Sequence, residues 1–270
     1  MAKKIVGLGC SWTQGEGGYP KEIWDDYGGR VNIPLHKDAH LRKYELENSW
    51  VNVLCRDHFT DHTPVNMGRR GIGNRAAVKQ LYRVTPDQVD WDNDTGYVIL
   101  MLSGLERFDF FSGKYNNWYC YMTMWPNPDH GNELWTQYAT QIYNEVNSCL
   151  ETWAAIREAE TFVKAHPGFK LVIANAFYSE HLPHHFMRHI PDLAGNIDWS
   201  RYAMTSEKPS YVLELVKADG MIDPSGTHYY NYYNSLKEPG KYLANCVHPT
   251  IEGYKLIAAD LSDFIKKRYL

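Results

Sequence analysis

Short apolar runs that alternate with helical stretches are the feature that most limits what this chain can fold into. One run, at residues 97–102, reads Tyr-Val-Ile-Leu-Met-Leu, as expected for a parallel strand buried on both faces. The predicted strands are residues 5–8, 64–66, 97–102 and 170–174. Apolar residues spaced three and four apart predict helices, at residues 49–59, 75–82, 133–164 and 250–269.

This alternation predicts the α/β class, with a parallel sheet covered by helices on both faces. We find no internal repeat, low-complexity tract or linker, so we predict a single domain over residues 1–270. Three polar and aromatic-rich stretches are predicted to be loop insertions, at about residues 16–47, 111–132 and 178–243.

Composition excludes several functional classes. The formal net charge is −4, so the composition does not indicate a basic surface for binding nucleic acid. No apolar run approaches the roughly 20 residues that a membrane-spanning helix needs. The five cysteines are odd in number and widely spaced, which indicates free thiols in a reducing compartment. The short apolar run after the N-terminal lysines is too brief for a signal peptide, so we expect a soluble protein made in the cytoplasm.

Two residues far apart in the sequence are candidates for one nucleophile–base pair. Ser11 follows the first predicted strand, where a serine is either a nucleophile or a helix cap. His248 precedes Pro249, which restricts its backbone, and Thr250, which can cap the helix that follows. Because ligand sites in open parallel sheets lie at the carboxyl ends of the strands, Ser11 is expected at such a site.

Three blocks resemble the motifs of the SGNH (GDSL-like) hydrolase superfamily. Residues 9–13 read Gly-Cys-Ser-Trp-Thr, residues 66–74 read Asn-Met-Gly-Arg-Arg-Gly-Ile-Gly-Asn, and residues 245–250 read Asn-Cys-Val-His-Pro-Thr. The Gly-Cys-Ser first block resembles bacteriophage-encoded variants. The resemblance covers the core of the chain, at roughly residues 4–15, 48–110, 133–177 and 244–270.

The resemblance implies a three-layer, flavodoxin-like fold and a serine esterase that needs no cofactor. Its substrate would be an acyl ester on a carbohydrate or cell-surface polysaccharide, as in a deacetylase. By position in the motifs, Ser11 would be the nucleophile, His248 the general base and Asn245 the residue that orients His248. The backbone N–H groups of Ser11 and Gly71, with the Asn74 amide, would form the oxyanion hole.

Three positions depart from the family pattern. Cys10 replaces an Asp in the first block, Glu106 stands where the family has Asn, and Asn245 replaces the Asp of the triad. An acid from an insertion, Asp219 or Asp223, is the alternative partner for His248. These departures leave a second hypothesis: a catalytically weak or inactive binding or structural module on the same fold, such as a phage tail or baseplate component with protein partners.

A histidine cluster is the third signal. It has no Cys, Asp or Glu between its members to complete a ligand set, so we predict no metal. A metal-dependent hydrolase that uses these side chains is the remaining hypothesis. The cluster consists of His181, His184, His185 and His189.

Overall fold

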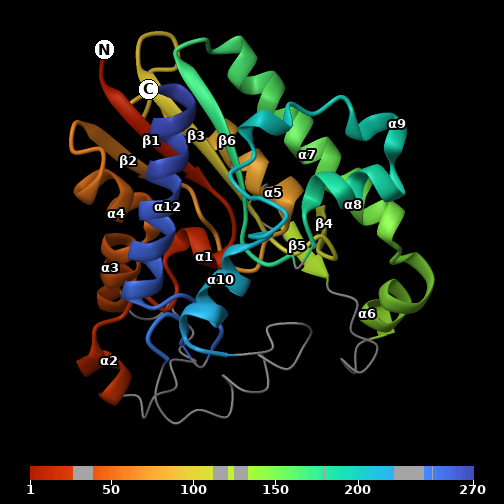
Figure 1. Ribbon diagram of the computed structural model, residues 1–270, viewed down its shortest axis with the longest axis horizontal. Helices are drawn as coiled ribbons and strands as arrows, with labels where there is room; N and C mark the ends of the chain where they lie inside the picture. The colour runs from red at the N-terminus through yellow and green to blue at the C-terminus, as the bar shows by residue number, and fades with distance from the viewer. Residues whose placement is uncertain (27–38, 112–120, 125–132, 179, 222–239, 245) are drawn as a thin grey trace.

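A parallel four-stranded sheet forms the centre of the molecule (Figure 1). The computed structural model describes residues 1–26, 39–111, 121–124, 133–178, 180–221, 240–244 and 246–270. The strands lie in the order β2-β1-β3-β6, and every neighbouring pair is parallel. Their bounds are β1 (Lys3–Leu8), β2 (His62–Asn66), β3 (Thr95–Leu102) and β6 (Phe169–Asn175).

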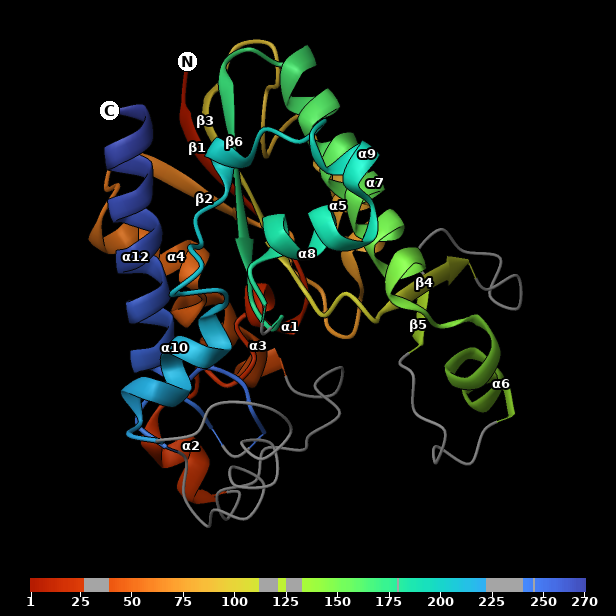
Figure 2. The ribbon, with the colours of Figure 1, turned by 45° about the vertical axis from the view of Figure 1, so that its right-hand side comes forward.

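Helices cover both faces of this sheet (Figure 2). On one face α4 (Trp50–Asp57) packs beside α12 (Ile251–Tyr269). On the other, α5 (Asn74–Lys79) packs against α7 (Glu145–Ala165). The predicted three-layer α/β fold is therefore confirmed.

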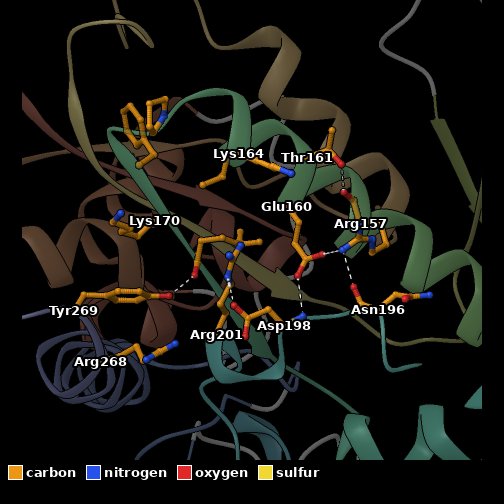
Figure 3. Close-up of a pocket in the computed structure, with 14 residues that line it drawn as sticks. Arg157, Glu160, Thr161, Lys164, Lys170, Asn196, Asp198, Arg201, Arg268 and Tyr269 are labelled. Carbon is orange, nitrogen blue, oxygen red and sulfur yellow. Dashed lines mark hydrogen bonds and ion pairs between the residues drawn. The ribbon is translucent and has the colours of Figure 1, made fainter. Parts of the chain in front are cut away.

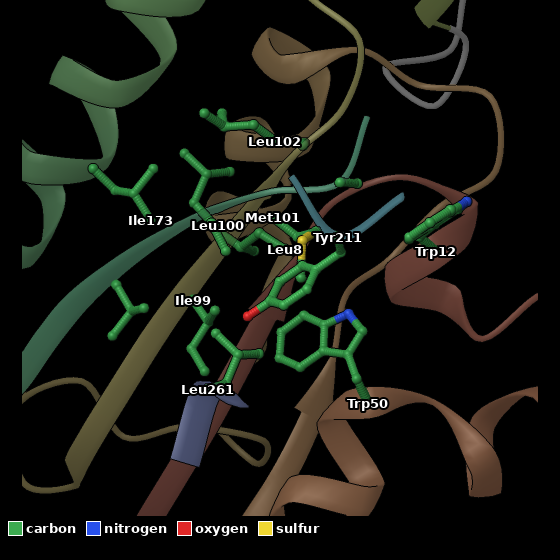
Figure 4. Close-up of a cluster of buried hydrophobic side chains, with 14 of the residues drawn as sticks. Leu8, Trp12, Trp50, Ile99, Leu100, Met101, Leu102, Ile173, Tyr211 and Leu261 are labelled. Atoms are coloured by element: carbon green, nitrogen blue, oxygen red, sulfur yellow. The ribbon is translucent and has the colours of Figure 1, made fainter. Parts of the chain in front are cut away.

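The core lies between the sheet and these helices. From Val98 to Leu102 every side chain of β3 is fully buried, which explains its uninterrupted apolar sequence. Figure 4 shows Trp50 of α4, Leu261 of α12 and Tyr211 at the start of α10 (Tyr211–Ala218) gathered near the strand side chains. Burying each large apolar side chain contributes about 1.5–3 kcal/mol, so this layer is a main source of stability.

Side-chain caps fix the starts of two predicted helices. The Ser49 hydroxyl accepts a hydrogen bond from the Asn52 N–H at the start of α4. The Thr250 hydroxyl does the same for the Gly253 N–H at the start of α12. Both helices begin where the sequence places them, because the cap satisfies an N–H group that has no partner inside the helix.

The single helix predicted over residues 133–164 is wrong. The chain forms α6 (Glu133–Gln137), a π-helical turn (Tyr138–Ile142) and then α7. The Asn144 side chain accepts from the Asn147 N–H at 2.9 Å and starts a new helix there. As a result Ile142, which continues the helical spacing in the sequence, is 48% exposed.

The three predicted insertions also contain regular structure. Residues 16–47 include α2 (Lys21–Asp26) and most of α3 (Ala39–Asn48). Within residues 111–132, β5 (Tyr121–Met124) pairs antiparallel with β4 (Phe108–Phe111). The third insertion holds α8 (Leu182–His189), α9 (Pro191–Ala194), a 3₁₀ turn (Trp199–Arg201) and α10. These elements are short, so they leave little periodic signal in the sequence. In the part of the chain that is described, no helix is long and apolar enough to cross a membrane.

Candidate active site

Ser11 lies at the carboxyl end of β1, as the sequence predicts. The strand ends at Leu8, and the one-turn helix α1 (Ser11–Gln14) begins at the serine. Cys10 is the residue before the helix, and its carbonyl accepts from the N–H groups of Thr13 and Gln14. The Cys10 side chain is fully buried, whereas Ser11 keeps 6% of its surface exposed. Cys10 is therefore a packed core residue, and Ser11 is the side chain at the sheet edge.

The structure brings Ser11 and His248 together. His248 Nε2 lies 2.8 Å from Ser11 Oγ, although 237 positions separate them in the sequence. His248 Nδ1 lies 2.9 Å from the carbonyl oxygen of Cys246. Since a carbonyl can only accept, Nδ1 carries the proton of the neutral ring and Nε2 presents its lone pair to the serine hydroxyl. This is the tautomer that a general base requires.

A tight turn holds the Cys246 carbonyl in that position. Ala244 N–H donates to the His248 carbonyl at 2.8 Å, and Val247 N–H donates to Ala244 at 2.9 Å. Val247 is buried and has φ of +59°, a left-handed conformation that a β-branched residue rarely adopts. Strained backbone of this kind persists where the surrounding structure enforces it, often at functional sites.

Of the two acids proposed as partners of His248, only Asp219 lies within the described residues. Asp219 accepts hydrogen bonds from the backbone N–H groups of Tyr242 and Leu243, at 2.9 and 3.1 Å, and so fixes the chain that leads to the histidine turn. Asp223 lies outside the described residues, as does Asn245. The role predicted for Asn245 stays a prediction.

Glu16 supplies a carboxylate that the sequence reasoning missed. Its Oε2 lies 3.3 Å from His248 Nε2, and both side chains are about four-fifths buried. The flanking glycines Gly15 and Gly17 have φ of +105° and +94°, which places Glu16 on a sharply turned backbone. A Cβ at Gly17 would lie 2.8 Å from the Cβ of His248, so the turn packs directly on the histidine. The Gly-Glu-Gly-Gly sequence at residues 15–18 was the available signal.

The Glu16 carboxylate changes the titration of the base. Burial disfavours the charged imidazolium, but the attraction of Glu16, together with the interactions of Cys246, outweighs it and raises the pKa of His248 from 6.5 to about 9. His248 is therefore mostly protonated at neutral pH. Its neutral, proton-accepting form becomes abundant only in alkaline solution.

Glu16 belongs to a buried polar network. Its Oε1 lies 3.4 Å from a guanidinium nitrogen of Arg70, and Arg70 also pairs with the fully buried Glu45. Glu45 accepts from the Tyr19 hydroxyl and, at 3.1 Å, from the Gln14 amide. Burial, and then the charge of Glu45, raises the pKa of Tyr19 far above its usual range, so this phenol stays a donor. Two carboxylates and one guanidinium thus share a largely buried site, in which Arg70 Nε has no hydrogen-bond partner among the described residues.

The loop after β2 is fastened to α1. Arg69 N–H donates to the Gly9 carbonyl and Arg70 N–H to the Gln14 side chain, each at 3.0 Å. Gly71 follows directly, with φ of +69° and no atom within 4 Å of the position a Cβ would take. The glycine predicted for the oxyanion hole therefore follows a loop that contacts α1, the helix that begins at Ser11, and it borders open space.

The Asn74 amide is engaged elsewhere. Its oxygen accepts from the Ser103 N–H at 2.8 Å, and its nitrogen donates to the Thr152 hydroxyl at 3.0 Å. The residue is 96% buried, since only 4% of its surface is exposed. These contacts join α5, the end of β3 and α7. Glu106 lies in the turn after β3, where its backbone carbonyl accepts from the Tyr138 hydroxyl.

A separate pocket of about 740 Å³ lies at the opposite edge of the sheet (Figure 3). It is bordered by Phe169 and Lys170 at the amino end of β6, so it does not adjoin the carboxyl edge that carries Ser11. Arg157, Arg201 and Asp198 in its wall are tied into ion pairs and backbone hydrogen bonds. We therefore place the candidate active site at Ser11 and not at this pocket.

No protein-family model and no curated protein matches this sequence. Among solved structures, the chain is similar to an acetyl xylan esterase (Est2A) from the rumen bacterium Butyrivibrio proteoclasticus, with 14% identity and a TM-score of 0.49. That match covers 98% of this chain and 63% of the other, so this chain spans less than two thirds of that protein. A carbohydrate acetylesterase family member from Sinorhizobium meliloti matches over 98% of both chains, with 14% identity and a TM-score of 0.41.

Proposed function

We propose that this protein is a serine esterase of the SGNH type. The observation that carries the proposal is the 2.8 Å contact between Ser11 Oγ and His248 Nε2, in a histidine whose other nitrogen faces a backbone carbonyl. A serine hydroxyl is a poor nucleophile until a positioned base removes its proton. This arrangement meets that requirement at the carboxyl edge of a parallel sheet, where such folds bind their ligands.

The reaction proceeds in two halves. Ser11 Oγ bonds to the ester carbonyl carbon while its proton passes to His248 Nε2. The tetrahedral intermediate then breaks its C–O bond to the alcohol, which takes the proton from Nε2 and leaves an acyl-serine. Water attacks this ester by the same route, with His248 accepting and returning one proton, and the carboxylic acid departs.

Backbone N–H groups stabilise the negative charge on the intermediate. The Ser11 N–H is at the first position of α1 and so has no partner within the helix. We assign it and the Gly71 N–H as the oxyanion donors, because loop 66–71 is fastened to α1. We leave the Asn74 amide out of this set, since Ser103 and Thr152 already bind it.

We assign the two roles of the Asp in a Ser-His-Asp triad to two different groups of this protein. Such an Asp orients the histidine and stabilises the imidazolium that forms. In this proposal the Cys246 carbonyl orients the ring through Nδ1, and Glu16 supplies the negative charge from the Nε2 side. The position that the family gives to Asp is Asn245 here, and a neutral side chain there leaves the charge to Glu16.

The substrate class rests on the motif resemblance: an acetyl or other short acyl ester on a carbohydrate. Acetylated carbohydrate is also named in the descriptions of the two structural neighbours, and it is the first class to assay.

The test compares two neighbouring substitutions on an aryl acetate and on acetylated xylan. Ser11→Ala should lower kcat/KM at least about a thousandfold, since the nucleophile is lost. Cys10→Ala is the matched control, because Cys10 is buried and adjacent but takes no part in the proposed chemistry. A fluorophosphonate probe should label wild type and the control and leave Ser11→Ala unlabelled. A Ser11→Ala protein that hydrolyses at the wild-type rate would overturn the proposal.

The non-catalytic alternative makes the opposite prediction. A binding or structural module would show no turnover on either substrate and no probe labelling at Ser11. That pair of results would favour it over the esterase.

A further inference from the structure

A second group of chemistry-bearing side chains lies where α7 and α8 meet, outside the serine site. Glu145 is the first residue of α7, and His185 and His189 lie one turn apart on α8. From each of the three, one potential ligand atom lies within 4.8 Å of the others. His184, on the same helix, is exposed and outside this group.

The surroundings of His185 hold its ring in place, as they would for a metal ligand. Only 2% of its surface is exposed. Its Nε2 lies 3.2 Å from Glu145 Oε2, and its ring centroid lies 4.5 Å from that of His189. Two ligands of a tetrahedral ion with bonds of about 2.0 Å stand about 3.3 Å apart. The carboxylate and the imidazole therefore have the separation that one such ion requires.

The other nitrogen of His185 also has partners. Nδ1 lies 2.8 Å from the Tyr178 hydroxyl and 3.4 Å from Glu180 Oε2. Histidine ligands of metals usually donate their second N–H to a carboxylate or similar acceptor, which fixes the ring. Glu180 gives His185 that support at Nδ1, while Nε2 faces both Glu145 Oε2, at 3.2 Å, and the Tyr178 hydroxyl, at 3.0 Å.

We propose that Glu145, His185 and His189 form a site for a zinc-class divalent metal ion. Two imidazoles and one carboxylate suit Zn²⁺, Co²⁺ or Ni²⁺ and do not suit Ca²⁺ or Mg²⁺, which prefer oxygen ligands. The remaining coordination position would hold water. This replaces the expectation of no metal, which rested on the lack of an acid between the histidines: the acid comes from another helix.

An ion here would fasten α7 to α8 and to the segment after β6. Tyr178 lies in that segment, and its neighbour Phe177 packs edge-on against Trp12, with ring centroids 4.7 Å apart. Trp12 directly follows the nucleophile. An ion here would brace the packing next to Ser11, and it takes no part in the proton transfers proposed there.

The test is a titration of metal-stripped protein with ZnCl2 by calorimetry and with CoCl2 by visible absorption. Wild type should bind one Zn²⁺ per chain, give the absorption of tetrahedral Co²⁺, and gain on the order of 5 °C in Tm at saturating Zn²⁺. Ca²⁺ and Mg²⁺ should produce neither the binding heat nor the Tm gain.

Variants separate this site from adventitious histidine binding. Glu145→Gln and His189→Gln should each weaken Zn²⁺ binding more than about 100-fold, since even outer partners of a metal are worth 10- to 100-fold. Both residues are at least partly exposed, so circular dichroism should show a wild-type fold. His184→Gln is the matched control and should bind as wild type. Absence of one-to-one binding, or binding that survives either substitution unchanged, would overturn the proposal.

Discussion

The Glu16–His248 contact predicts an alkaline pH profile that one substitution should move. With the pKa of His248 at about 9, only about 1% of the base is neutral at pH 7. Glu16→Gln keeps the shape of the side chain and removes its charge. Removing that charge should lower the pKa of His248, because burial is then opposed only by the contributions of Cys246. The full rise from 6.5 to about 9 is about 2.5 pH units, on the order of 3 kcal/mol, and the charge of Glu16 is its largest raising cause.

The assay is kcat/KM for an aryl acetate between pH 5.5 and 10.5. Wild type should rise with an inflection near pH 9, because this ratio reports the free enzyme's base. In Glu16→Gln the inflection should move to a clearly lower pH. The alkaline plateau should drop about 10- to 100-fold, less than the 10⁴ of a serine protease Asp-to-Asn change, because the Cys246 carbonyl still fixes the tautomer.

A control substitution and an NMR titration test whether Glu16 sets the pKa of His248. Glu22→Gln removes an exposed carboxylate from α2 and should leave the profile unchanged. An NMR titration of the His248 imidazole should give the same two pKa values as the kinetics. An inflection that stays near pH 9 in Glu16→Gln would show that Glu16 does not control the base.

Three further predictions concern stability and packing. Because folding raises the pKa of His248, its pairing with Glu16 stabilises the fold fully below pH 6.5 and is lost as pH rises through about 9; the urea-unfolding difference between wild type and Glu16→Gln should shrink across that window to the part that the Glu16–Arg70 ion pair contributes. Gly17→Ala places a Cβ 2.8 Å from that of His248 and should lower kcat/KM at least about tenfold. Gly195→Ala is the control: no atom lies within 4 Å of the position its Cβ would take, so kcat/KM should not change. Thr250→Ala removes the cap of α12 and should cost about 1 kcal/mol by urea denaturation.

The parts of the fold that local pattern determines could be predicted. The central strand β3 and the capped helix α12 carry their signals within a few residues, as an apolar run and as a Thr followed by helical spacing. The break at Asn144 could not be predicted this way, because apolar residues continue at helical spacing through it. Its cause is one side-chain hydrogen bond to Asn147, which competes with helix continuation.

The candidate site also contains residues that could be predicted from the sequence and residues that could not. Ser11 and His248 could be proposed because short motifs place them, and the structure brings them within hydrogen-bond distance. Glu16 could not, since its contact with His248 depends on how the first and last parts of the chain pack. The same holds for Glu145, which reaches the α8 histidines only because α7 and α8 cross. A contact between side chains of two different helices or loops produces no periodic pattern in the sequence.

The proposed nucleophile and base stand 237 positions apart in the sequence, which determines when during synthesis the site can form. During synthesis Ser11 emerges with the first strand, whereas its base emerges only after the other three strands of the sheet. A nascent chain therefore carries an inert serine until α12 docks beside α4 and delivers the histidine turn. Under the proposed function, hydrolysis of a dye-releasing ester would report that the chain between Ser11 and His248 has closed into the completed fold.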